Sequence, residues 1–318
     1  MMIKESKPTR IAIVGAGNVG ATFAYSLLLS GLAGEIVLID NNQAKASGEA
    51  MDLNHAIPLT QPTRLWAGRY EDTAGSAITV ITAGSAQKPG ETRLDLVQRN
   101  IAILKGIIPE VVRYNPDGLI LMAANPVDIL TYAAWRISGL PSNRVIGSGT
   151  ILDTARFRYL LSQYARVDAR SVHAYIIGEH GDSEVPVWSL ANIAGMKLED
   201  YFAMNCRECE KDVFDRIFQA TRDAAYQIIQ RKGSTYYAIG SGLQRIVEAI
   251  LRDQDTVLSV STLIEDFHGI NDVYLSLPCV LGRNGIKQVL KIPLNPTEAE
   301  GFIHSASIMH ETIQSIGL

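Results

Sequence analysis

Short apolar runs alternate with stretches of helical spacing along the first half of the chain. The helical stretches cover residues 18–34, 41–56, 96–115 and 127–139, and the apolar runs lie before, between and after them, at 10–17, 35–40, 77–84, 118–126 and 144–149. Apolar runs joined by helices are typical of parallel strands that are buried on both faces. The pattern therefore predicts an α/β fold with a doubly wound parallel sheet.

The pattern changes near residue 150. Helical spacing covers 151–165 and 209–233, whereas β-rich stretches bounded by turn residues cover 255–266 and 273–292. This mixture indicates an α+β region with antiparallel strand pairing.

A last helix is expected to begin in the segment "NPTEAEG", where Thr297 and Glu300 have the spacing of a capping box. Because no repeat or linker interrupts the chain, we predict two closely packed domains, residues 1–148 and 149–318.

The composition fits a globular protein with a large core. Of 318 residues, 47% are hydrophobic and 19% are charged. The net charge of -4 gives no basic surface for nucleic acid or an anionic membrane. No apolar run is long enough to span a membrane, and the first residues lack the apolar region of a signal peptide. We therefore expect a cytoplasmic protein.

The three cysteines give a weak signal. Cys206 and Cys209 form a C-x-x-C pair, but it lies in a stretch of helical periodicity, far from the start of a strand–helix–strand unit. We interpret them as incidental helix positions and expect no metal site. A redox or metal protein that uses this pair remains the alternative.

A glycine-rich turn follows the first apolar run. Gly15, Gly17 and Gly20 have G-x-G-x-x-G spacing between a predicted strand and a predicted helix, and Asp40 ends the next strand. This context predicts a Rossmann-type site for a dinucleotide, with the pyrophosphate at the start of the helix. Asn18 and Val19 lie within the turn, so we expect them to contact the cofactor as well.

The choice of cofactor depends on Asp40. A carboxylate at this position accepts hydrogen bonds from the ribose hydroxyl groups and repels a 2′-phosphate. We therefore predict NAD rather than NADP.

Three residues of the second half suit acid–base chemistry on an anionic substrate. His180 lies in a glycine-flanked loop at the end of an apolar run, where an imidazole can transfer a proton near neutral pH. Asp153 and Arg156 are three residues apart and share one helix face. Asp153 would orient the imidazole, and Arg156 would bind a carboxylate through its planar guanidinium. The alternatives are a surface histidine and a surface ion pair.

These residues belong to a longer series of ordered motifs, including "GAGNVGA", "MDLNHA", "GSAQKPGETRLDLVQRN", "NPVDILTY", "GSGTILDTARFR" and "GEHGDSEVPVWS". Over essentially its full length the chain resembles the NAD-dependent L-lactate/malate dehydrogenase family, and within it the bacterial L-lactate dehydrogenases. The resemblance implies reversible hydride transfer between NADH and pyruvate, a step of glycolysis and pyruvate fermentation, with NAD as the cofactor.

The resemblance also implies roles for individual residues. His180 would be the acid/base, Asp153 its partner, and Arg156 the ligand of the substrate carboxylate. Arg93, on a lid formed by residues 85–100, would polarise the reacting carbonyl. Asn125 would lie near that carbonyl and the cofactor, and Thr235 would line the substrate pocket.

Gln87 is expected to select the substrate. Malate-specific relatives have an arginine at this position, whereas a neutral amide cannot balance a second, buried carboxylate. Lys88 and Glu91 are close in sequence and bear on the same choice. We therefore predict pyruvate and L-lactate, with malate dehydrogenase or a broader L-2-hydroxy-acid dehydrogenase as alternatives. An NAD-binding sensor without turnover would lack His180, Asp153 or Arg156.

The resemblance further implies a regulatory site and an assembly. Arg158 and His173 occupy the positions that bind fructose 1,6-bisphosphate between subunits in similar bacterial enzymes, and both residue types suit a phosphate. We therefore expect an allosteric homotetramer.

Overall fold

The main β-sheet joins both halves of the chain. The computed structural model describes residues 8–86, 90–205 and 212–317. Over these residues the sheet has nine strands in the order β14-β13-β12-β6-β5-β4-β1-β2-β3. Its strands are β1 (Arg10–Val14), β2 (Glu35–Ile39), β3 (Arg64–Ala67), β4 (Ile78–Ile81), β5 (Leu119–Met122), β6 (Val145–Gly147), β12 (Thr256–Ile264), β13 (Val273–Gly282) and β14 (Gly285–Val289).

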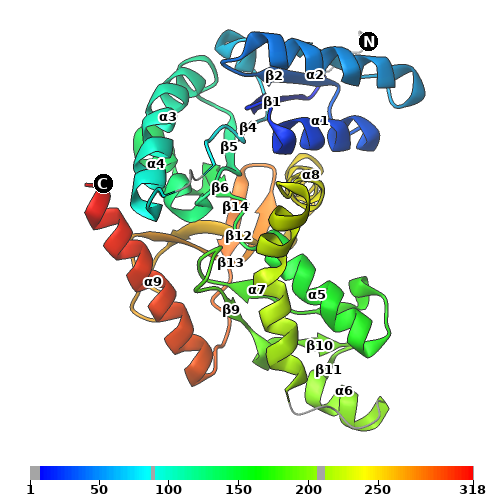
Figure 1. Ribbon diagram of the computed structural model, residues 1–318, viewed down its shortest axis with the longest axis vertical. Helices are drawn as coiled ribbons and strands as arrows, with labels where there is room; N and C mark the ends of the chain where they lie inside the picture. Colours follow the sequence, from blue (N-terminus) through cyan, green and yellow to red (C-terminus); the bar gives the residue numbers. More distant parts are fainter. Residues whose placement is uncertain (1–7, 87–89, 206–211, 318) are drawn as a thin grey trace, which may run out of the picture.

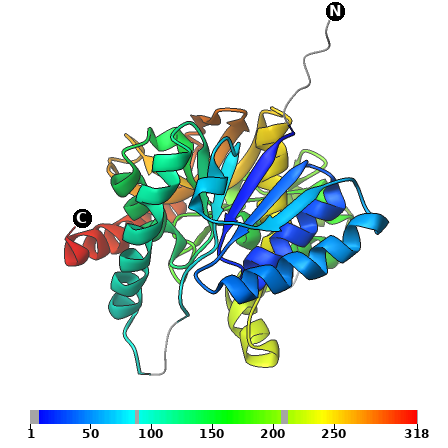
Figure 2. The same cartoon turned by 90° about the horizontal axis from the view of Figure 1, so that it is seen from above.

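Helices cover both faces of this sheet, as predicted. The α-helices of the described residues are α1 (Asn18–Ser30), α2 (Gln43–Ala56), α3 (Arg93–Tyr114), α4 (Val127–Ser138), α5 (Ile151–Ala165), α6 (Leu198–Asn205), α7 (Val213–Lys232), α8 (Tyr237–Leu251) and α9 (Pro296–Ile316). Of these, α1, α2 and α8 pack on one face of the sheet, and α3, α4 and α9 on the other. Figure 1 shows α3 and α4 grouped apart from α1 and α2, and Figure 2 shows the strands between these two groups. Within the described residues, no helix has the length and apolar character needed to cross a membrane.

The core explains the apolar runs. Ile11 and Ile13 of β1 pack into the cluster that contains α1, α2 and α8, whereas Ala12 and Val14 pack into the cluster that contains α3, α4 and α9. All four side chains are buried. Because successive side chains of a strand point to opposite faces, a strand covered on both sides must be apolar throughout.

The parallel and antiparallel regions form one continuous sheet. The strands from β3 to β6 pair in parallel, and β12 pairs antiparallel with β6 where Ser261 lies opposite Gly147. Strands β12, β13 and β14 then pair antiparallel with one another. The predicted α/β class is confirmed, and the predicted antiparallel strands extend the same sheet.

Short strands complete the second half. Strands β10 (Asn192–Ile193), β11 (Met196–Lys197) and β7 (Val172–His173) form a small sheet, and β8 (Ile176–Ile177) pairs with β9 (Val185–Pro186). The connection from β8 to β9 carries the glycine-flanked histidine.

The predicted helix at 151–165 is confirmed, but the sequence pattern did not reveal β3, α6 or α8. Strand β3 has one buried side chain, Leu65, so it forms no apolar run. Helix α8 contains Gly240 and Gly242, which lower its helix propensity, although its apolar residues lie on one face. Gly240 has a packing reason, because a Cβ atom there would lie 2.9 Å from Thr22 of α1.

The capping box of the last helix lies two residues before the predicted pair, Thr297 and Glu300, so that prediction was wrong. The N-cap is Asn295, whose side chain accepts the Glu298 N–H at 2.9 Å, while Glu298 accepts the Asn295 N–H at 3.0 Å. Both pairs have capping-box spacing, but Pro296 suits the first helical position and so favours Asn295 as the cap.

This cap can be tested with a matched pair of variants. Asn295→Ala should lower the free energy of unfolding by about 1 kcal/mol, because it leaves N–H groups of the first turn without a partner. The exposed Thr297→Ala is the control and should change it by less than about 0.5 kcal/mol. Urea unfolding of both variants measures the difference, and equal losses would contradict the assignment.

Candidate active site

The three glycines of the turn after β1 meet three different requirements. Gly15 has φ +112°, and a Cβ there would overlap Thr82 and Ala83. Gly20 lies so close to the Gly15 carbonyl that a side chain would overlap it. In contrast, apart from its chain neighbours and its own helix backbone, no heavy atom of the described residues lies within 4 Å of the Cβ position of Gly17. The turn is therefore tight, and its backbone is open to a ligand at Gly17.

Asp40 holds this turn against the end of β2. Its carboxylate accepts the Ala16 N–H at 2.7 Å and the Asn42 N–H at 2.9 Å. Gly15 and Asp40 both line a cavity of about 360 Å³ at the carboxyl ends of the strands, which we call the Gly-loop cavity. Open α/β sheets bind ligands at this edge.

The residues of the Gly-loop cavity fit NAD. Gly17 is the N-cap of α1 and makes no side-chain capping bond, so the first N–H groups of the helix can face a pyrophosphate. Asp40 stands at the position that suits ribose hydroxyls. Asn18 donates a hydrogen bond to Ser234 at 3.0 Å, and Val19 packs on the core beside the turn.

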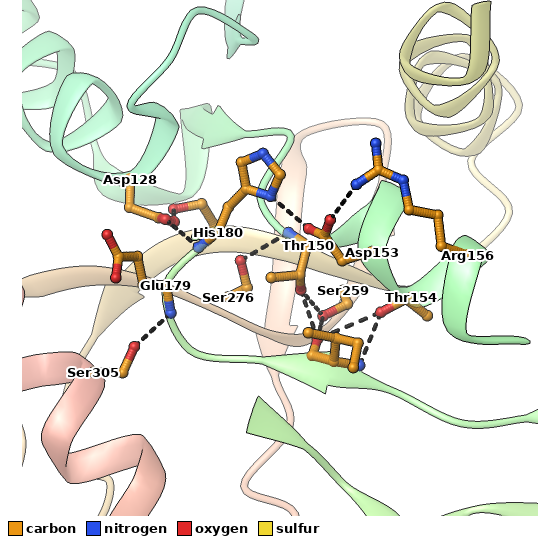
Figure 3. Close-up of polar contacts among 12 residues, drawn as sticks. Asp128, Thr150, Asp153, Thr154, Arg156, Glu179, His180, Ser259, Ser276 and Ser305 are labelled. Atoms are coloured by element: carbon orange, nitrogen blue, oxygen red, sulfur yellow. Dashed lines mark hydrogen bonds and ion pairs between the residues drawn. The ribbon is translucent and has the colours of Figure 1, made fainter. Parts of the chain in front are cut away.

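A buried carboxylate links the histidine and the arginine. Asp153 in α5 is 3% exposed. Its Oδ2 lies 2.5 Å from His180 Nδ1, and its Oδ1 accepts a hydrogen bond from Arg156 Nη1 at 2.9 Å. Figure 3 shows both side chains directed at Asp153, His180 from the β8–β9 connection and Arg156 from α5. The predicted surface alternatives do not fit this arrangement.

The opposite charges of His180 and Asp153 shift the pKa of each residue. Burial alone would lower the pKa of His180, but the charge and hydrogen bond of Asp153 outweigh burial and raise the pKa to about 9. Burial would raise the pKa of Asp153, yet His180 and Arg156 hold that pKa below its ordinary value. The pair is therefore an imidazolium and a carboxylate at neutral pH.

Two further buried acids fix the loop that carries His180. Asp128 of α4 accepts the His180 backbone N–H at 2.7 Å and the Ser261 hydroxyl at 2.6 Å. Glu179 is 2% exposed, and its N–H donates to Ser305 of α9 at 2.6 Å. Helices α4 and α9 thus hold the backbone of Glu179 and His180.

His180, Asp153 and Arg156 line one cavity of about 340 Å³, which we call the His180 cavity. Arg93, the first residue of α3, and Asn125 also line it. The guanidinium of Arg93 pairs with Glu179, so a buried acid holds this half-exposed cation at the cavity wall. The structure therefore brings five of the predicted residues together.

Other predicted residues lie elsewhere. Thr235, between α7 and α8, is not among the described residues that line the His180 cavity. Gln87 and Lys88 lie outside the described residues, as do Cys206 and Cys209. Glu91 accepts a hydrogen bond from Arg99 Nη2 at 2.9 Å.

The predicted regulatory pair occupies a different region. Arg158 of α5 donates to the Ala174 carbonyl at 2.8 Å, and its guanidinium lies 5.1 Å from the centre of the Tyr175 ring. Ala174 follows His173 of β7, which is exposed. The two predicted residues therefore belong to neighbouring segments.

The sequence interpretation missed several residues of the site. Glu179 and Glu184 stand in the quoted motif of His180, "GEHGDSEVPVWS", so their proximity in sequence was a usable signal. Asp128 stands in the quoted motif "NPVDILTY", far from His180 in sequence, so that only the fold shows their contact. Arg222 and Tyr226 of α7 also line the His180 cavity. They belong to an amphipathic helix whose pattern gives no indication of a site.

Comparison with known proteins places the chain among dehydrogenases. A family model for the lactate/malate dehydrogenase NAD binding domain matches residues 9–147, and a model for the alpha/beta C-terminal domain of the same family matches residues 150–317. A protein of Moorella thermoacetica named L-lactate dehydrogenase is 53% identical, covering 98% of both chains. L-lactate dehydrogenase 1 of Clostridium acetobutylicum is 50% identical, covering 98% of this chain and 99% of its own.

Solved structures agree. A lactate dehydrogenase enzyme from a Medee basin deep-sea metagenome library superposes with a TM-score of 0.95 at 42% identity, covering 98% of this chain and 100% of its own. The minor L-lactate dehydrogenase of Enterococcus mundtii gives 0.94 at 41% identity, covering 98% of this chain and 99% of its own.

The His180–Asp153 pair predicts a stability that depends on pH. The folded protein holds the His180 proton up to pH about 9, above its ordinary pKa of 6.5, so the pair stabilises fully below pH 6.5 and loses this effect as the pH rises through 9. Asp153→Asn should therefore cost on the order of 3 kcal/mol at pH 6.5 and clearly less at pH 10.

Urea unfolding at the two pH values measures this difference. Asp168→Asn is the matched control, because Asp168 is exposed and pairs with an arginine that stays charged. It should have the same small effect at both pH values. An Asp153→Asn cost that does not change with pH would contradict the ion pair.

Proposed function

The chain belongs to the lactate/malate dehydrogenase family, and from this premise we propose that it is an NAD-dependent L-lactate dehydrogenase that interconverts pyruvate and L-lactate. The observation that carries the proposal is the shared carboxylate. Asp153 bonds both a proton donor, His180, and a guanidinium, Arg156, within one cavity.

Each residue has a task that follows from its chemistry. The bound nicotinamide supplies the hydride for reduction and accepts it in the reverse direction. His180 as an imidazolium donates a proton to the substrate oxygen, and as a neutral imidazole it removes that proton again. Asp153 fixes the ring, because its bond to Nδ1 leaves Nε2 as the nitrogen available for the exchange.

Arg156 holds the substrate carboxylate. Its side chain is 13% exposed, and its hydrogen bond to Asp153 uses one of its five N–H donors. A planar guanidinium held in this way can still bind a carboxylate through two parallel hydrogen bonds. The carboxylate then fixes the distance from the reacting carbon to His180, and such positioning accounts for much of the rate in oriented reactions.

Arg93 and Asn125 complete the site in this proposal. Arg93 would polarise the reacting carbonyl, because negative charge develops on its oxygen during reduction. Asn125, exposed at the rim of the same cavity, would donate a hydrogen bond near that oxygen. Thr235 is assigned to the pocket by the resemblance alone.

In this proposal pyruvate is preferred to oxaloacetate because of the neutral side chain of Gln87. Gln87 is uncharged, so a second carboxylate on the substrate would lack a cation from this position. Malate dehydrogenase and a broader L-2-hydroxy-acid dehydrogenase are the alternatives, and they differ in whether the cavity accepts a charged or a larger substituent.

We further propose a homotetramer that fructose 1,6-bisphosphate activates. Arg158 and His173 lie on neighbouring segments and are both able to bind a phosphate near neutral pH. The proposal keeps the division into a cofactor part, residues 1–148, and a substrate part, residues 149–318. It also keeps a cytoplasmic location and a place in glycolysis and pyruvate fermentation.

One set of assays tests substrate and regulation. Oxidation of NADH should be at least about tenfold more efficient, as kcat/KM, with pyruvate than with oxaloacetate, because an unpaired buried charge costs several kcal/mol. Gln87→Arg should move the preference toward oxaloacetate, and Glu311→Gln, on an exposed position of α9, should leave it unchanged. A wild type that prefers oxaloacetate would contradict the proposal.

Addition of fructose 1,6-bisphosphate supplies the second arm. It should lower KM for pyruvate in the wild type and have little effect in Arg158→Gln, which removes a charged phosphate ligand. If it changes neither pyruvate saturation nor the oligomeric mass of the wild type, the regulatory part of the proposal is wrong while the assignment of the substrate stands.

A further inference from the structure

Glu184 is an acid in the wall of the His180 cavity that the mechanism above does not use. It lies in the β8–β9 connection and is 6% exposed. Its Oε1 is buried and has no hydrogen-bond partner among the described residues. A carboxyl oxygen without a partner is costly to bury, and far more costly when it is charged. Such a group in a substrate cavity therefore needs an explanation.

The neighbours of Glu184 explain why Glu184, rather than Asp153, keeps a proton. The charged groups that act most on it are Asp153 and Arg156 of α5, His180 of its own loop and Arg222 of α7. Arg93 of α3 and Asp182 of the same loop also line the cavity. Asp153 takes direct bonds from both His180 and Arg156 and is therefore the carboxyl that ionises. Two nearby buried carboxyls rarely both ionise when one of them has the direct cationic partners.

The titration of Glu184 agrees with this geometry. Burial first, and then the charge of Asp153, raise the pKa of Glu184 to about 8, although His180, Arg156 and Arg222 act in the opposite direction. Near neutral pH the wall of the cavity therefore presents a neutral carboxylic acid, and at higher pH it presents an anion.

We propose that Glu184 sets the charge of the substrate cavity, so that its protonated form admits the carboxylate of the substrate to Arg156 and its ionised form opposes that binding. The inference rests on the proposed function, because it needs an anionic substrate at Arg156. Among the described residues, Glu184 forms no hydrogen bond or ion pair with Asp153 or Arg156, so its effect on them is electrostatic. It is a positioning and selection residue rather than a proton donor.

The effect of Glu184 ionisation differs from that of His180 deprotonation in the kinetic constant that it changes. Loss of the His180 proton removes the acid of the reaction, whereas ionisation of Glu184 weakens binding and so acts on KM more than on kcat. Repulsion between two like charges that share one cavity is large enough to change affinity about tenfold. The carboxylate of Glu184 would also oppose a dicarboxylic substrate.

The test compares Glu184→Gln with the wild type in NADH oxidation by pyruvate at pH 7 and pH 9. Glutamine has the shape of the neutral acid and cannot ionise. KM for pyruvate should rise by up to about tenfold more in the wild type than in Glu184→Gln over this interval, because a group with a pKa of about 8 goes from mostly protonated to mostly ionised, and the changes in kcat should be similar. The exposed Glu311→Gln is the charge-matched control and should retain the wild-type pH dependence.

A binding measurement gives the same comparison without turnover. Oxamate, an unreactive analogue of pyruvate, should lose affinity for the NADH complex between pH 7 and pH 9 more steeply in the wild type than in Glu184→Gln. Wild type that fails to reduce pyruvate at pH 7 would overturn the proposed function. A second outcome is that the wild type reduces pyruvate normally, but KM and oxamate affinity change with pH in the same way in the wild type and in Glu184→Gln. That outcome would overturn the Glu184 inference alone.

Discussion

The site depends on one buried carboxylate that has two cationic partners. Asp153 is almost fully enclosed, so its charge is stable only because His180 and Arg156 bond to its two oxygens. An isolated carboxylate at this depth would take up a proton or destabilise the fold. The same constraint places the proton donor and the carboxylate ligand in one cavity and raises the pKa of the imidazole to about 9. It also leaves Glu184, which has no direct cationic partner within the described part of the chain, as the acid that stays neutral near pH 7.

The sheet supplies the rigid frame for this carboxylate. At the start of α5, the Thr150 hydroxyl donates to the Ile176 carbonyl at 2.6 Å, and the Thr150 N–H donates to Ser276 of β13 at 3.0 Å. These bonds, visible in Figure 3, join the helix of Asp153 to β8, which leads into the loop of His180. The antiparallel strands that extend the sheet therefore hold both partners at a fixed distance, next to the edge where the Gly-loop cavity lies. Catalysis gains from such preorganisation because no rearrangement is needed during the reaction.

Residue patterns predicted the parts of the protein whose physics is local. The two-sided burial of β1 and the extent of α5 are readable from the order of residues, and the glycine spacing at Gly15 follows from a backbone requirement. Strand β3 was not predictable because its pairing with β2, rather than its own composition, makes it a strand. The same limit applies to the site. His180 and Asp153 were found from their residue types, but whether Glu184 in a polar loop would be enclosed without a partner depends on α5 and α7, which pack against it from distant parts of the chain.

The most direct test of the central role of Asp153 is the titration of His180 by nuclear magnetic resonance in the free protein, compared between wild type and Asp153→Asn. The account predicts that the wild-type imidazole titrates well above pH 6.5, because the carboxylate stabilises its charged form, and that the pKa falls by more than one unit in the variant, where burial acts without compensation. A His180 pKa that is the same in both proteins would contradict it.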